Sequence, residues 1–134
     1  MVEEYKIWLL RAKSNLSLAS AKGDKWIVYE DFCFQAQQAA EKALKALILF
    51  YGVEPERTHN LITLIKVLSK YEAIPDKIKS AVSLNDYAVQ TRYPGDYTAV
   101  TKTEYAKAVR IARACVKWVE KRIKLLEKNR PNLF

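Results

Sequence analysis

The sequence predicts an all-α fold, an up-and-down antiparallel bundle of four to five helices. Glycine and proline are scarce, with 3 Gly and 4 Pro among 134 residues, which favours a few long helices over short strands joined by turns. Apolar residues recur at spacings of three and four, so they share helix faces. The hydrophobic fraction of 50% is enough to bury a core without disulfide or metal. A chain of this length is expected to form one domain, residues 1–134.

Two helices are predicted in the first part of the chain. The first spans residues 2–21 and ends at Gly23, and Asp24 can cap the helix that follows. Its apolar face holds Tyr5, Leu9, Ala12, Leu16 and Ala19. The second helix is expected at residues 24–51, with an alanine-rich face made of Cys33, Ala36, Ala40, Ala43, Leu47 and Phe50. Because small side chains allow close approach of a neighbour, this helix is expected at the centre of the bundle.

Three further helices are predicted in the rest of the chain. One is expected at residues 58–71 with Thr58 as its N-cap, and the next begins at Pro75 and reaches about residue 92. Pro94 and Gly95 break the chain there, and the last helix is expected at residues 101–127. The apolar faces hold Leu61, Leu64, Ile65 and Leu68, then Ile78, Ala81, Asn85 and Ala88, then Tyr105, Ala108, Ala112, Val116, Val119, Ile123 and Leu126. Since every connection is short, consecutive helices are expected to be antiparallel neighbours.

The scarcity of cysteine and histidine limits the chemistry that the chain can perform. We interpret Cys33 and Cys115 as small buried side chains in a reducing compartment, because both stand in apolar segments. A structural zinc site usually needs four Cys or His ligands, so no metal site and no cofactor is predicted. The longest apolar run, residues 46–51, is far shorter than the roughly 20 residues that span a bilayer. The amino terminus does not resemble a signal peptide, so a cytoplasmic location without membrane contact is expected.

The positive charge is concentrated near the carboxyl terminus. The formal net charge is +8, and residues 102–130 hold ten basic against three acidic residues, a difference of +7. Six basic residues at helical spacing are called the basic stripe here: Arg110, Arg113, Lys117, Lys121, Lys124 and Lys128. The basic stripe could hold RNA phosphates, bind an acidic protein surface or keep the protein soluble. Trp118 is the only aromatic residue between residues 110 and 128, so sequence-specific RNA recognition by base stacking is poorly supported.

Three stretches of the chain resemble the HEPN family, named for its occurrence in higher eukaryotes and prokaryotes and for nucleotide binding by association. Residues 32–47 read FCFQAQQAAEKALKAL and are similar to the family's signature helix, with its FxAQQAxEKxLKAL pattern. Residues 58–61, THNL, resemble the start of the next helix. Residues 92–94, RYP, resemble the end of the fourth helix in one prokaryotic branch. The stretches fall in the family's order, and the resemblance covers about residues 3–126.

The resemblance implies a bundle of four or five helices that commonly forms homodimers. It also implies, for prokaryotic members, pairing with a minimal nucleotidyltransferase, frequently as a toxin–antitoxin couple. Some HEPN proteins are metal-independent ribonucleases, in which an arginine is followed after four to six residues by a histidine. Arg92 stands at the equivalent arginine, but Tyr97, Thr98 and Ala99 occupy the three possible histidine positions.

The only histidine, His59, cannot complete that motif with another arginine. Gly52, Val53 and Glu54 occupy the positions upstream of it where the arginine would stand. The ribonuclease motif is therefore absent from the chain, and the sequence favours a protein that is not an enzyme.

A polar cluster is predicted where the fourth helix ends: Arg92, Tyr93, Asp96 and Tyr97. In one interpretation it forms a pocket for a phosphate or for the backbone of a partner, because an arginine fork suits phosphate. In the other, Arg92 caps the helix carbonyls and pairs with Asp96. Asn85 lies two turns earlier on a mostly apolar face, where it either anchors the core by hydrogen bonds or lines the same pocket.

The second predicted helix carries a polar side with Gln38, Glu41, Lys42 and Lys45. Gln35, Gln38, Glu41 and Lys42 could contact a partner or pack beside the fourth predicted helix. A charged helix face is usually solvated, however, and Glu41 with Lys45 has the spacing of a surface ion pair. His59 is expected to pack or to donate a hydrogen bond rather than to catalyse, because no second titratable group is near it in the sequence.

These observations favour an accessory HEPN-like protein that homodimerises and pairs with a nucleotidyltransferase-type partner, as in toxin–antitoxin couples. The alternative is a divergent ribonuclease in which Arg92 stabilises phosphate charge and Tyr97 replaces the missing base, although tyrosine is a poor base with an ordinary pKa of about 10. A third hypothesis is a binder of nucleotide or RNA that uses the basic last helix.

Overall fold

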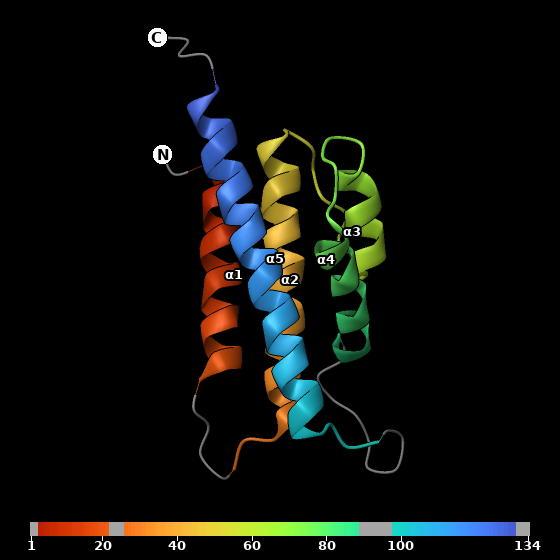
Figure 1. The fold of residues 1–134 in the computed structure, drawn as a ribbon. Coiled ribbons are helices and arrows are strands. Elements are labelled where there is room, and N and C mark those ends of the chain that lie inside the picture. The colour runs from red at the N-terminus through yellow and green to blue at the C-terminus, as the bar shows by residue number, and fades with distance from the viewer. Residues whose placement is uncertain (1–2, 22–25, 89–97, 131–134) are drawn as a thin grey trace.

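The computed structural model describes residues 3–21, 26–88 and 98–130, and within these ranges every regular element is helical. The elements are α1 (Glu4–Ser20), α2 (Tyr29–Phe50), α3 (Leu61–Leu68), α4 (Asp76–Lys79), the 3-10 helix η1 (Ser80–Tyr87) and α5 (Lys102–Lys128). Figure 1 shows the long helices α1, α2 and α5 packed side by side, with α3, α4 and η1 on the other flank of α2. The predicted all-α bundle is confirmed.

Helix α2 is the centre of the bundle, as its alanine content predicts. It packs against α1, α5, α3 and η1. Its buried face carries alanines with no exposed surface, namely Ala36, Ala39, Ala40, Ala43 and Ala46, among the larger side chains of Leu44, Leu47 and Ile48. Small residues on a central helix let the neighbouring backbones approach on several sides, which is why one helix can contact four elements.

Contacts between side chains fix the direction of each helix. Helix α1 runs antiparallel to α5, because Tyr5 at its start bonds Glu127 and Ser20 at its end bonds Arg113. Helix α2 runs parallel to α5, and the ring of Tyr29 stacks on that of Tyr105 near the beginning of both helices. Since α1 runs against α5, it also runs against α2.

Helix α3 departs from the expectation that consecutive helices are antiparallel. The connection at residues 51–60 turns back along α2, so His59 reaches Glu41 in the middle of α2. At the other end of α3, Glu72 bonds Tyr51 at the end of α2. Helix α3 therefore runs parallel to α2 (Figure 1), and the connection itself becomes part of the packing.

Several helix boundaries differ from the predicted ones for local reasons. Helix α2 begins after the extended residue Val28, later than expected, and the proposed cap Asp24 lies outside the described residues. Asn60 caps α3 in place of Thr58, since its side chain accepts from the N–H of Ile62. Helix α5 is capped by Thr101, whose hydroxyl oxygen accepts from the N–H of Glu104 at 3.1 Å.

The predicted fourth helix is α-helical only at its beginning. Pro75 precedes α4 as its N-cap, and the chain continues from Ser80 as a 3-10 helix. Two serines favour the tighter turn, because the Ser80 hydroxyl donates to the Lys77 carbonyl and the Ser83 hydroxyl donates to the Ser80 carbonyl. The predicted apolar positions Ile78 and Ala81 are buried there.

Both cysteines are buried and free, as predicted. Burial raises the pKa of the Cys115 thiol to about 12. Burial, together with the charges of Glu30 and Glu104, raises the pKa of Cys33 to about 12 as well. Both thiols are therefore inert, structural side chains at neutral pH. Separately, none of the helices in the described ranges is long and apolar enough to cross a membrane.

Candidate functional site

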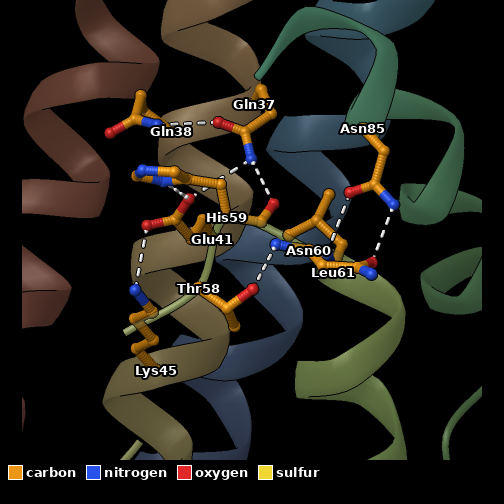
Figure 2. A network of polar contacts seen from close by, with 9 residues as sticks. All are labelled: Gln37, Gln38, Glu41, Lys45, Thr58, His59, Asn60, Leu61 and Asn85. Carbon is orange, nitrogen blue, oxygen red and sulfur yellow. Dashed lines mark hydrogen bonds and ion pairs between the residues drawn. The ribbon is translucent and has the colours of Figure 1, made fainter. Parts of the chain in front are cut away.

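The polar residues proposed from the sequence fall into two groups in the structure. Arg92, Tyr93, Asp96 and Tyr97 lie outside the described residues. Gln38, His59 and Asn85 lie on α2, in the connection before α3 and in η1, where they belong to two adjoining sets of hydrogen bonds (Figure 2). Lys42, also on α2, belongs to neither set.

The first set is a buried polar network, by which we mean Gln37, Glu41, Lys45 and His59. The Glu41 carboxylate is its centre: one oxygen lies 2.8 Å from Nδ1 of His59, and the other accepts from Nζ of Lys45 at 3.1 Å. Gln37 donates to Glu41 at 3.3 Å and to the backbone carbonyl of His59 at 3.1 Å. The network ties the connection before α3 onto the middle of α2 (Figure 2).

The expectation of a solvated surface pair between Glu41 and Lys45 is wrong in one respect. The two residues do pair, but their side chains are only 4% and 8% exposed. The cause is tertiary: the residues before α3 cover Glu41, and the ring of Trp8 on α1 lies 5.6 Å from the Lys45 ammonium. A helical spacing of four identifies the pair but cannot reveal what covers it.

The fold gives His59 a titratable neighbour that its sequence surroundings do not indicate. Its neighbour is Glu41, 18 positions away in the sequence. The His59 side chain is 69% exposed, whereas that of Glu41 is 4% exposed. A buried carboxylate that holds Nδ1 orients the ring and leaves Nε2 toward solvent, the arrangement in which a histidine can bind a ligand or transfer a proton.

Asn85 is an anchor between η1 and the start of α3. Its side-chain oxygen accepts from the N–H of Leu61 at 2.9 Å, and its amide nitrogen donates to the Asn60 side chain at 3.0 Å. Both bonds serve the N-terminal turn of α3, whose N–H groups have no partner within the helix. A surface pocket of about 360 Å³ adjoins this set and is lined by Thr58, His59, Asn60, Asn85 and Ala88. These bonds agree with the anchoring interpretation of Asn85, whereas the pocket proposed around Arg92 lies outside the described residues.

Replacing Asn85 by alanine is expected to lower the free energy of unfolding by about 1–3 kcal/mol, because the N–H of Leu61 loses its partner. Urea unfolding followed by circular dichroism measures the loss. Asp86→Ala, in the same 3-10 helix and exposed, is the control and should change the value by less than about 0.5 kcal/mol. Equal effects of the two variants would contradict the anchoring role.

Gln38 and Lys42 face outward from α2, next to the buried polar network. Gln38 donates to Gln37 at 2.7 Å. Lys42 is half-buried, and its pKa is lowered by burial and then by the charge of Arg11 on α1. Neither Lys42 nor Arg11 has an ion pair within the described ranges. The sequence could not predict that Arg11 lies near Lys42, because only the packing of α1 on α2 brings the two residues together.

A second buried carboxylate escaped the sequence analysis. Glu72, after α3, accepts two bonds from the guanidinium of Arg122 on α5, at 2.7 and 3.0 Å, and a third from the hydroxyl of Tyr51. Burial and the bond to Glu72 raise the pKa of Tyr51 to about 12. These bonds join the ends of α2 and α3 to α5. Because the Glu72 carboxylate is fully hydrogen-bonded within the protein, we interpret this cluster as structural.

The basic stripe lies on one side of α5. Arg110, Lys117, Lys121, Lys124 and Lys128 are exposed, whereas Arg113 is half-buried and donates to the hydroxyl of Ser20 at 2.8 Å. The acids nearby are engaged elsewhere: Glu120 bonds Lys13 at 2.6 Å and Glu127 accepts from Tyr5 at 2.8 Å. Among the described residues, the exposed members of the stripe form no ion pair, although the charge of Lys124 acts on Glu120.

Metal chemistry receives no support from the described part of the chain. Within it, no group of three or more His, Cys, Asp or Glu side chains is placed to hold a metal ion. The buried polar network has the elements for orienting a ligand or a proton, while the basic stripe has those for attracting a polyanion.

Comparison with known proteins connects this architecture to a family. A model of the HEPN domain matches residues 5–122. The crystal structure of TT1696 from Thermus thermophilus has a TM-score of 0.75 to this chain at 32% identity, and the similarity covers 90% of this chain and 98% of that one. The structure of ST0689, an archaeal HEPN homologue, has a TM-score of 0.68 at 26% identity, covering 91% and 99%. None of the curated proteins matches.

Proposed function

The chain belongs to the HEPN domain family, and from that premise we propose that it is a non-enzymatic accessory protein that homodimerises and pairs with a nucleotidyltransferase-type partner. The observation that carries the proposal is the missing histidine after Arg92, where Tyr97, Thr98 and Ala99 stand. The only histidine of the chain, His59, lies in the connection before α3, where its Nδ1 is 2.8 Å from the carboxylate of Glu41 on α2.

Exposed apolar side chains on α1 support a contact with a second copy. Ile7, Leu10 and Leu18 are 42%, 68% and 51% exposed, and their spacing places them on one face of the helix. A cluster of exposed apolar residues often marks a protein contact. Ser14 continues this face, and Arg11 also lies on it.

Homodimerisation is tested by light scattering coupled to size-exclusion chromatography at micromolar concentration. The wild-type protein is expected to have twice the mass of the chain, and Leu10→Glu should shift it to the monomer. Leu125→Glu, at a similarly exposed leucine on α5, is the control and should remain dimeric. A wild-type monomer would contradict the dimer, and a dimer lost only in the Leu125 variant would move the contact to α5.

The nucleotidyltransferase-type partner is tested by co-expression with the product of the neighbouring gene. A stable pair is expected to elute together at micromolar concentration. Separate elution would refute the pairing. Purified protein that degrades RNA, with activity lost in Arg92→Ala, would refute the non-enzymatic part and favour the divergent ribonuclease.

The basic stripe favours a second candidate function, sequence-independent binding of RNA. Its exposed lysines form no ion pair among the described residues, and lysine is depleted in protein interfaces while it neutralises phosphates well. Affinity for a single-stranded oligonucleotide should fall steeply as salt increases, and the slope should become shallower in Lys117→Gln with Lys121→Gln. Binding that is independent of salt would exclude this function.

A further inference from the structure

The imidazole ring of His59 is held at one nitrogen and open at the other. Its Nδ1 lies 2.8 Å from the carboxylate of Glu41, which is 4% exposed, while the His59 side chain is 69% exposed. Glu41 pairs with the Lys45 ammonium at 3.1 Å, so it is ionised, and an ionised carboxylate only accepts hydrogen bonds. The proton of the neutral ring therefore sits on Nδ1, and Nε2 keeps a free electron pair.

The connection before α3 is also held without this ring. The backbone carbonyl of His59 accepts from the side chain of Gln37 at 3.1 Å, and Asn85 holds the N–H of Leu61 at the start of α3. The bond from Nδ1 to Glu41 thus adds something that the backbone contacts do not supply: it fixes the tautomer and the direction of an exposed ring (Figure 2).

A buried carboxylate behind a solvent-facing imidazole favours nucleophilic chemistry at the far nitrogen. The carboxylate orients the ring and stabilises the positive charge that the ring gains when Nε2 forms a new bond. Histidine is itself one of the side chains that form covalent adducts in proteins. The two thiols of the chain, Cys33 and Cys115, are buried and so do not compete for a reagent in solution.

We propose that His59 is a phosphoryl-acceptor site, modified on Nε2 by a donor of the phosphoramidate class, in which phosphorus is bonded to a protonated nitrogen. The electron pair of Nε2 forms a bond to phosphorus while the bond between phosphorus and the donor's nitrogen breaks. The donor's nitrogen keeps that electron pair and leaves as a neutral amine. Nδ1 keeps its proton, and Glu41 balances the positive charge of the phosphorylated ring.

The chemistry of the acceptor decides the class of donor. One phosphorus–nitrogen bond replaces another, so the exchange is close to balanced in energy, and the Glu41 carboxylate favours the product. A phosphomonoester is not expected to donate, because transfer from oxygen to nitrogen is uphill. The phosphoryl group adds about −1.5 to −2 charges at neutral pH and would change the surface that the connection before α3 presents.

This modification does not depend on the proposed pairing with a nucleotidyltransferase-type protein. It is a stoichiometric reaction of one side chain, so it is compatible with a protein that is not an enzyme. The test uses the isolated chain, whereas the pairing is tested by co-expression, and the two proposals therefore fail in different experiments.

The test is incubation of the folded protein with phosphoramidate at neutral pH, followed by intact mass and by phosphorus nuclear magnetic resonance. Because His59 is the only histidine, a phosphoimidazole signal is assigned without ambiguity. Native His59 is expected to react at least about tenfold faster than N-acetylhistidine, a modest share of what a positioned acid–base group supplies. A proton–phosphorus correlation should place the phosphorus on Nε2, and glycerol 2-phosphate should give no product.

Variants of the buried carboxylate separate activation from exposure. Glu41→Gln keeps the size of the side chain and one oxygen acceptor but removes the charge, so its rate should fall to within about twofold of that of N-acetylhistidine. If Glu41→Gln does not fold, the double variant Glu41→Leu with Lys45→Met removes the same carboxylate without leaving a buried charge unpaired. Glu120→Gln removes a carboxylate that pairs with Lys13 on α1 and should react like the wild type.

Three results would overturn the acceptor site. One is a native rate no faster than that of N-acetylhistidine, which would mean that exposure alone governs the reaction. Another is an unchanged rate in a folded variant that lacks the Glu41 carboxylate. The last is a product phosphorylated on Nδ1, since that nitrogen would then not be held by Glu41.

Discussion

Replacing Glu41 by alanine is expected to lower the free energy of unfolding by about 3–5 kcal/mol, the usual cost of removing one partner from a buried ion pair. Lys45 would keep its charge with 8% of its side chain exposed and would lose its carboxylate. Gln37 and His59 would also lose the acceptor that holds the connection before α3. Urea unfolding followed by tryptophan fluorescence and circular dichroism measures the change.

The matched control is Glu120→Ala, which removes a carboxylate from a more exposed ion pair. Its partner Lys13 is 53% exposed, so the loss should be about 0–1 kcal/mol. A double variant, Glu41→Leu with Lys45→Met, removes both buried charges and should recover most of the stability. If Glu41→Ala costs no more than Glu120→Ala, the buried polar network does not stabilise the fold.

Replacing Ala40 by leucine is expected to destabilise the protein by about 1–3 kcal/mol or more, because the added carbons have no space. Ala40 has no exposed surface and lies in the core of the central helix. Leucine is as good a helix former as most residues, so the loss would come from packing rather than from helix propensity. Thermal and urea unfolding measure it.

Ala106→Leu provides the comparison for that substitution. Ala106 is exposed on α5, so the same added carbons meet solvent and should change stability by less than about 0.5 kcal/mol. A neutral Ala40→Leu variant would show that the neighbours of α2 can move apart, and the close approach attributed to its alanines would then be wrong.

The residues that resemble the HEPN signature serve two purposes in the fold. Gln37, Glu41 and Lys45 are buried and hold the connection before α3 against α2. Gln38 and Lys42 alternate with them and remain half-buried at the surface. Resemblance to the signature therefore predicts the fold well, and Gln38 and Lys42 are its two outward positions.

Helical periodicity by itself predicted the all-helical bundle and its buried faces, although not the direction of α3. The spacing of Ala12 and Ala19 on α1, and of Ala112 and Val119 on α5, predicted faces that are buried in the structure. The alanines of α2 predicted its central position because small side chains let neighbouring helices approach closely in any bundle. The direction of each side chain around a helix depends only on local geometry, so a buried face can be predicted from the sequence.

Only the tertiary structure decided which polar residues meet. Periodicity places Glu41 and Lys45 one turn apart but cannot show that the connection at residues 51–60 folds back over them. It cannot place Arg11 beside Lys42, or Glu72 beside Arg122, since each pair joins different elements. The physical reason is that a residue's burial and charge environment depend on the side chains packed over it, and these come from distant parts of the chain. The packing of α1 and of the α2–α3 connection onto α2 therefore fixed the candidate site.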